Sequence, residues 1–75
     1  MSFYPASRHL ETVGPRVERS LAVPASAFIA EQGGLDAAVG TMARHLGLRS
    51  AKSLTAIRET LALLQAGEAL PANQP

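Results

Sequence analysis

Residues 35–64 read LDAAVGTMARHLGLRSAKSLTAIRETLALL, and this stretch decides the fold. Its apolar residues recur at the spacing of an α-helix on both sides of Gly47. The stripe before the glycine consists of Leu35, Val39, Met42, Ala43 and Leu46, and the stripe after it consists of Leu54, Ile57, Leu61 and Leu64. A glycine after such a stripe ends a helix, because it enters the left-handed conformation without steric penalty. The stretch therefore predicts two helices that meet at a tight turn.

Polar residues indicate where these two helices begin. Asp36 falls in the first turn of the earlier helix, where exposed backbone amides favour a negative charge. For the later helix, either Ser50 or Ser53 can accept a hydrogen bond from the first free amides. The sequence leaves both alternatives open.

The corner between the two predicted helices has a recognisable composition. Ala43 lies four residues before Gly47, the apolar Leu46 and Leu48 flank the glycine, and the polar run 49–53 follows. A small residue in the first helix allows the second helix to cross it closely, while the flanking leucines bury the corner. These features are typical of a helix-turn-helix.

Residues 45–54, HLGLRSAKSL, resemble the corner that leads into the recognition helix of LexA-type repressors, which are winged-helix proteins. The resemblance to helix-turn-helix repressors implies a small DNA-binding transcriptional regulator of phage, plasmid or bacterial origin. Residues 65–75, QAGEALPANQP, predict no strand hairpin, so we expect the helix pair without the wing of that family.

The polar residues around the corner form the candidate DNA-binding site. Cationic side chains hold phosphates, hydroxyl groups bond a phosphate or a base edge, and a threonine methyl contacts thymine. The candidates are Arg44, Arg49, Ser50, Lys52, Ser53 and Thr55. The alternative is an ordinary solvated face, because Glu59 on the same side of the helix repels phosphate. Since the net charge of the chain is only +1, DNA contact depends on these local cations.

The residues outside this pair predict shorter elements. Residues 1–7 are expected to form a flexible arm. We expect one short helix over residues 7–13, a break at Gly14 and Pro15, and a second helix from Pro15 to Ala22. Ser26 is predicted to cap a further helix that ends before the Gly33–Gly34 pair. Residues 67–75 are predicted to be a disordered tail.

Together these patterns predict an all-α fold, a compact cluster of four to five short helices within a single domain at residues 8–66. The chain is 47% apolar but only 4% aromatic, so its interior must be built from small aliphatic residues, which favours helices. A 75-residue chain without cysteine buries a small core, so we expect a homodimer to add buried area. The candidate dimer or partner interface consists of Phe3, Tyr4, Leu61, Leu63 and Leu64.

Several other classes of protein are excluded by the sequence. It has no apolar run long enough to span a membrane and no signal peptide, so we expect a cytoplasmic protein. His9 and His45 are isolated and there is no cysteine, so no metal site is predicted. Without a catalytic motif or a phosphate-binding loop, we expect neither enzymatic activity nor a cofactor.

A protein-binding role is the alternative to DNA binding. Three features suit an apolar protein interface: the nearly neutral charge, the position of Leu63 opposite the core stripe of its helix, and the aromatic Phe3 and Tyr4 in the arm 1–7. On this interpretation the chain is a small helical adaptor or inhibitor, of the anti-activator or anti-defence type. Salt separates the two hypotheses, because only a DNA complex weakens steeply as the salt concentration rises.

Overall fold

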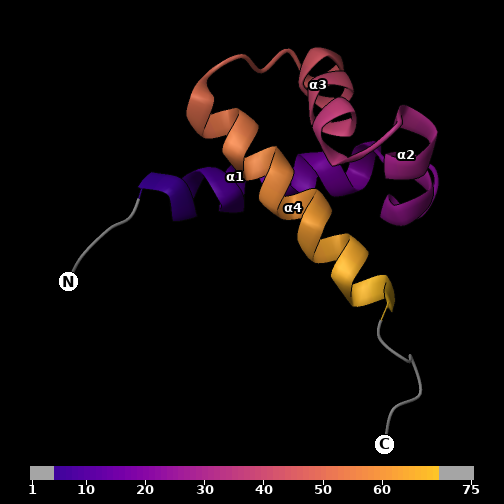
Figure 1. The fold of residues 1–75 in the computed structure, drawn as a ribbon. Coiled ribbons are helices and arrows are strands. Elements are labelled where there is room, and N and C mark those ends of the chain that lie inside the picture. The colour runs from indigo at the N-terminus through magenta and orange to yellow at the C-terminus, as the bar shows by residue number, and fades with distance from the viewer. Residues whose placement is uncertain (1–4, 70–75) are drawn as a thin grey trace, which may run out of the picture.

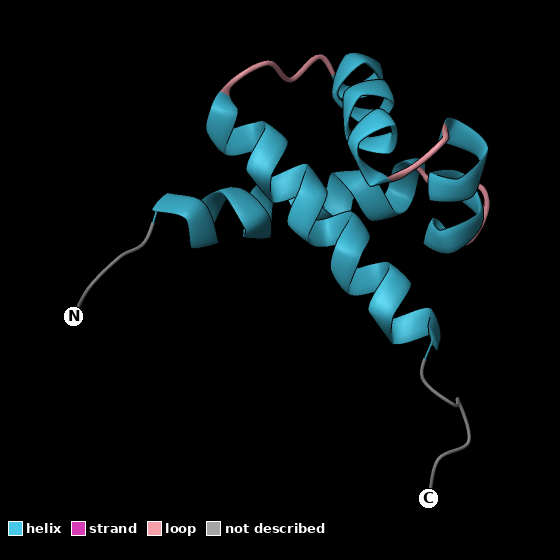
Figure 2. Ribbon diagram, in the orientation of Figure 1, coloured by secondary structure: helices cyan, strands magenta, loops and turns pink. Residues whose placement is uncertain are grey.

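A computed structural model describes the chain over residues 5–69, with side chains over residues 10–68. It contains four helices: α1 (Pro5–Ser20), α2 (Ala25–Gln32), α3 (Leu35–Leu46) and α4 (Ala51–Ala69) (Figure 1). The prediction of an all-α fold is confirmed, because the described part of the chain has no strand (Figure 2). None of these four helices is both long and apolar enough to cross a membrane.

The longest helix, α4, is the centre of the fold. It packs against each of the other three helices, crossing α1 while α2 and α3 lie to one side of that crossing (Figure 1). Small and branched aliphatic side chains fill the interior, as the shortage of aromatic residues predicts. The buried apolar residues are Val13, Val17, Ala25, Ile29, Ala38, Val39, Met42, Ala43, Ala56, Ile57 and Leu61.

The first helix runs without interruption through Gly14 and Pro15, so the predicted break there is wrong. A proline inside a helix costs about 3 kcal/mol, because it removes one hydrogen bond and crowds the preceding turn. Val13 and Val17 are buried on either side of it, and burying two valines contributes at least about 3 kcal/mol. Tertiary packing therefore offsets the local preference for a break.

Glycines end α2 and α3, as predicted. Gly33 has φ 93° and Gly47 has φ 72°, and both adopt the left-handed conformation. At the end of α3, the N–H of Gly47 donates to the carbonyl of Arg44 at 3.3 Å, and the N–H of Leu48 donates to that of Ala43 at 2.9 Å. This paired arrangement satisfies the last carbonyls of the helix and turns the chain sharply.

The start of α2 differs from the prediction that Ser26 caps it. The helix begins at Ala25, two residues before the start that a Ser26 cap implies, and Pro24 before it provides no side-chain hydrogen bond. Instead the carboxylate of Glu68, at the far end of α4, accepts hydrogen bonds from the N–H groups of Ala25 (2.7 Å) and Ser26 (3.0 Å). The hydrogen bond from the Ser26 backbone is the main reason that the pKa of Glu68 is lowered.

The predicted start of the disordered tail is also wrong. Residues 67–69, which were expected to be disordered, continue α4, and Glu68 among them holds α2. The expected tail residues 70–75 lie outside the described part of the chain.

Candidate nucleic-acid interface

The corner between α3 and α4 is fixed from several directions. Leu46 and Leu48 are half-buried and pack against the core, as predicted for the residues that flank the turn glycine. The guanidinium of Arg16, which is half-buried in α1, donates from Nη2 to the carbonyl oxygen of Leu46 at 3.2 Å. An arginine in one helix therefore binds the last carbonyl of another and holds the corner in place.

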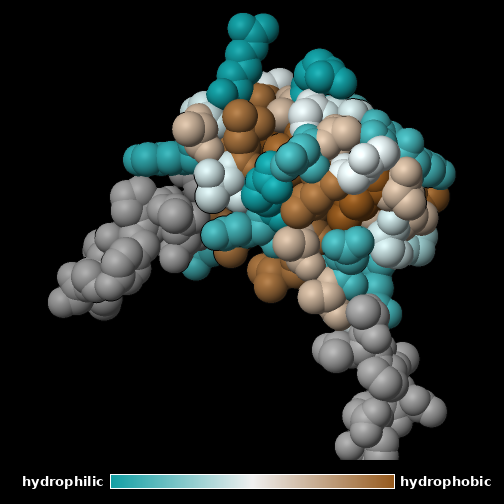
Figure 3. Space-filling view, in the orientation of Figure 1, coloured by the Kyte–Doolittle hydropathy of each residue, from teal (hydrophilic) through white to brown (hydrophobic). Residues whose placement is uncertain are grey.

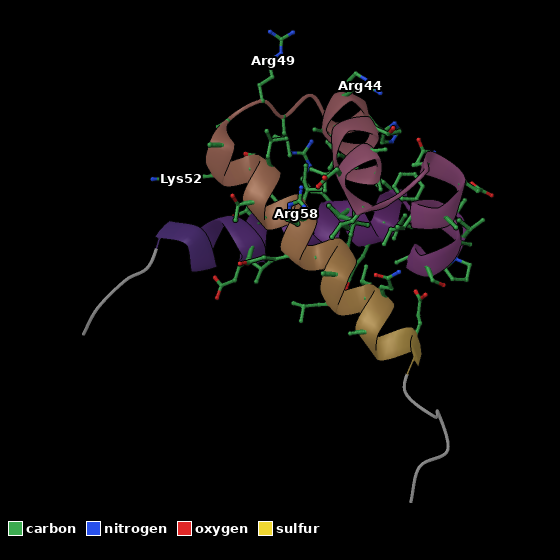
Figure 4. All side chains as sticks on the ribbon, in the orientation of Figure 1. Arg44, Arg49, Lys52 and Arg58 are labelled. Atoms are coloured by element: carbon green, nitrogen blue, oxygen red, sulfur yellow. The ribbon has the colours of Figure 1, made fainter. Side chains whose placement is uncertain are left out.

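Three of the predicted DNA-binding cations surround this corner. Arg44 lies near the end of α3, Arg49 lies in the connection, and Lys52 lies in the first turn of α4. All three are exposed, and Arg49 and Lys52 point away from the body of the protein in different directions (Figure 4). Arg44 and Arg49 line the same hollow beside Gly47. Positive charge is therefore spread over the corner.

The two serines of the predicted site have structural roles. Ser50 is the capping residue of α4, because its Oγ accepts the N–H of Ser53 at 3.1 Å and its hydroxyl donates to the Oγ of Ser53 at 2.9 Å. This decides between the two caps that the sequence allowed. Ser53 is only 5% exposed, so its predicted contact with DNA is wrong. Ser50 itself is exposed.

The outer face of α4 changes charge along its length. Lys52 and Thr55 are exposed near its start and line one hollow on the surface. Arg58, one turn further on, forms an ion pair with Asp36 of α3. This is the only ion pair among side chains 10–68, so no carboxylate of that region pairs with the corner cations. Glu59 is exposed beyond them, and only the first two turns of the outer face are cationic.

The predicted dimer or partner interface is only partly on the surface. Leu61 is fully buried, so it belongs to the core and its assignment to an interface is wrong. Leu64 is half-buried, whereas Leu63 is 63% exposed, as its position opposite the core stripe predicts. Phe3 and Tyr4 lie outside the described residues.

Two long-range hydrogen-bonded contacts were not predicted from the sequence. The partner of Arg16 lies 30 residues away, and the amides bound by Glu68 lie 42 and 43 residues away, so no local pattern indicated either contact.

His45 is exposed near the corner. No group of three His, Cys, Asp or Glu side chains able to hold a metal ion occurs in the described part of the chain.

Comparison with known proteins gives no relative to set beside this geometry. No protein-family model matches the chain, and no curated protein or solved structure matches it.

Proposed function

We propose that this protein binds duplex DNA through the corner between α3 and α4, as a small transcriptional regulator of phage, plasmid or bacterial origin. One observation carries the proposal: Arg44, Arg49 and Lys52 are exposed together at one end of the protein, and no described carboxylate pairs with them. Clustered cations of this kind supply most of the affinity of proteins for the phosphate backbone.

The proposed complex uses α3 and α4 as a helix-turn-helix pair. In such a pair the first helix crosses the DNA backbone, and the amino-terminal residues of the second helix contact bases in the major groove. Arg44, Arg49 and Lys52 would hold phosphates, while Thr55 would face the groove from the first two turns of α4. Glu59 limits how deeply the helix enters, because its carboxylate repels phosphate.

The directions of the cations favour an extended polyanion as the ligand. Arg49 and Lys52 diverge, so they do not converge on one small anion, but they suit phosphates distributed along a strand (Figure 4). Three phosphate contacts predict that the logarithm of the binding constant falls with the logarithm of salt concentration with a slope of about −3.

A homodimer extends the proposal. Two copies would read successive major grooves if their corners were about 34 Å apart. Each copy supplies a complete set of corner cations, so DNA contact itself requires only one chain. Such a regulator would act in the cytoplasm, where bacterial DNA lies.

The test is fluorescence anisotropy with a labelled DNA duplex, repeated over a series of salt concentrations. We expect the R49A/K52A variant to weaken binding and to make the salt slope shallower by about 2, because two phosphate contacts are lost. Arg58→Ala is the matched control, because it removes a cation of the same helix that already pairs with Asp36.

Two results would contradict DNA binding through the corner. One is the absence of any complex with duplex DNA at low salt. The other is an affinity that responds to R49A/K52A no more than to the control. Sedimentation of the free protein and of the complex measures the number of copies.

A further inference from the structure

A groove with an apolar floor lies between α1 and α4, away from the basic corner. Leu10, Gly14 and Pro15 of α1 line one side, and Leu63 and Leu64 of α4 line the other. Apolar surface is visible below the crossing of the two helices in Figure 3. Gly14 of α1 faces Thr60 of α4, because a Cβ added to the glycine would lie 3.4 Å from Oγ1 of Thr60.

The rim of this groove exposes a large apolar side chain. Leu63 is 63% exposed, whereas the core leucine two residues earlier, Leu61, is fully buried. A single exposed leucine is common, but one at the edge of an apolar groove adds to a continuous surface. The groove is therefore suited to receive apolar side chains from another molecule.

Carboxylates surround the groove. Glu11 and Glu18 are exposed, line it, and lie seven residues apart, so they share one face of α1 about 10 Å apart along the axis. Glu59 precedes Leu63 by four residues and shares its face of α4. No cation is among the described residues that line the groove. Its electrostatic potential is therefore complementary to a basic partner.

We infer that this groove is a docking site for a basic amphipathic helix of a partner protein. The distance between Glu11 and Glu18 corresponds to two helical turns. It matches two basic residues seven positions apart in the incoming helix, whose apolar anchors would follow the pattern i, i+3 or i+4, and i+7. Lysine or arginine residues beside those anchors would face the two glutamates, while the anchors would cover Leu63.

Charge argues against two other occupants. In a symmetric pair of copies, Glu11 and Glu18 of both chains would face each other across the interface, and like charges at an interface are unfavourable. Nucleic acid would be repelled by the same carboxylates. The groove is therefore independent of the basic corner, and neither proposal requires the other.

The experiment uses two synthetic peptides of about 18 residues with the full-length protein. One peptide carries leucine and lysine at helical spacing, and the other has glutamate in place of every lysine. Isothermal titration should show at least about tenfold tighter binding of the lysine peptide. Leu63→Ser should weaken that binding about tenfold, and the exposure of Leu63 means that this variant keeps its fold.

Reversing the charge of the groove provides a more discriminating test. The E11K/E18K variant should prefer the glutamate peptide, whereas Glu31→Lys, which changes an exposed glutamate of α2, should keep the original preference. The R49A/K52A variant should bind the lysine peptide like the unmodified chain. Failure of DNA binding and failure of helix docking are thus measured separately.

Each alternative occupant has an outcome that overturns the inference. Equal binding of both peptides, or binding that Leu63→Ser leaves unchanged, would exclude the groove as a specific site. Self-association that Leu63→Ser abolishes would identify a second copy as the occupant. Binding of the lysine peptide only after Phe3 and Tyr4 are replaced by serine would identify the chain's own N-terminal residues as the occupant.

Discussion

Glu68 accepts a hydrogen bond from the backbone N–H of Ser26 at 3.0 Å, so the last turn of α4 caps the first turn of α2 across 42 residues. The same carboxylate accepts the N–H of Ala25 at 2.7 Å. An eight-residue helix is too short to be stable alone, and its amino-terminal amides need acceptors. The carboxylate supplies both the acceptors and a negative charge where the helix dipole favours it.

This cap predicts a loss of stability in acid. The pKa of Glu68 is lowered in the folded protein by its bonds to the Ser26 and Ala25 amides. The cap therefore contributes fully above the ordinary glutamate pKa of 4.5, and its contribution is lost as the pH falls through the lowered value. Glu68→Gln should lower the thermal midpoint at pH 7, and the difference from the unmodified protein should shrink in acid.

The matched control for this pH effect is Glu31→Gln, which changes an exposed glutamate near the other end of α2. Its thermal midpoint should follow that of the unmodified protein at both pH values. A deficit of Glu68→Gln that remained the same at low pH would show that the carboxylate charge is not what stabilises α2.

Two leucines in α4 should respond very differently to truncation. Leu61 is fully buried, so Leu61→Ala should lower the free energy of unfolding by about 3 kcal/mol through lost burial and a residual cavity. Leu63 is 63% exposed, so Leu63→Ala should change it by less than about 0.5 kcal/mol. Urea titration followed by circular dichroism measures both. Similar losses would mean that Leu63 is covered in solution.

The turn at Gly47 predicts a cost that depends on backbone conformation. An added Cβ would meet nothing within 4 Å, so the cost of Gly47→Ala comes from its φ of 72° and should be about 1 kcal/mol. Gly47→Asn should cost less, because asparagine tolerates this conformation. Gly67→Ala, in open space within α4, should instead stabilise by about 0.5 kcal/mol. Chemical denaturation of the three variants tests this order.

The proline inside α1 predicts a stabilising substitution. Pro15→Ala restores a helical N–H and should raise the free energy of unfolding by about 2 kcal/mol, after allowing for the greater freedom of the unfolded chain. Pro24→Ala, just before α2, is the control, and no gain is expected there because Pro24 lies outside a helix. A loss of stability in Pro15→Ala would mean that the proline ring makes contacts that α1 needs.

The sequence predicted those parts of the fold that depend on neighbouring residues. Gly33 and Gly47 end helices because their conformational freedom acts locally, and Ser50 was one of two serines placed to cap α4. The break at Gly14 was predicted wrongly because the packing of α1 against α4 is a contact between distant segments. The cap from Glu68 escaped prediction for the same reason.

The exposure of the candidate site residues was likewise predicted correctly for some residues and wrongly for others. Arg49 and Lys52 were expected on the surface and are exposed. Ser53 and Leu61 were expected to be available for binding, yet both face the interior, because α4 packs against three helices and buries a wide arc of its surface. A periodic pattern locates the centre of a buried face, but the width of that face depends on how many neighbours cover it.

Because α4 is long, it extends from the basic corner to the groove between α1 and α4. Lys52 and Leu63 belong to the same continuous helix, about 16 Å apart along its axis. The helix has no break between these residues. A molecule bound at one end would therefore keep a constant distance and orientation relative to a molecule bound at the other end. If both proposals hold, α4 would act as a fixed spacer between the DNA and the partner helix.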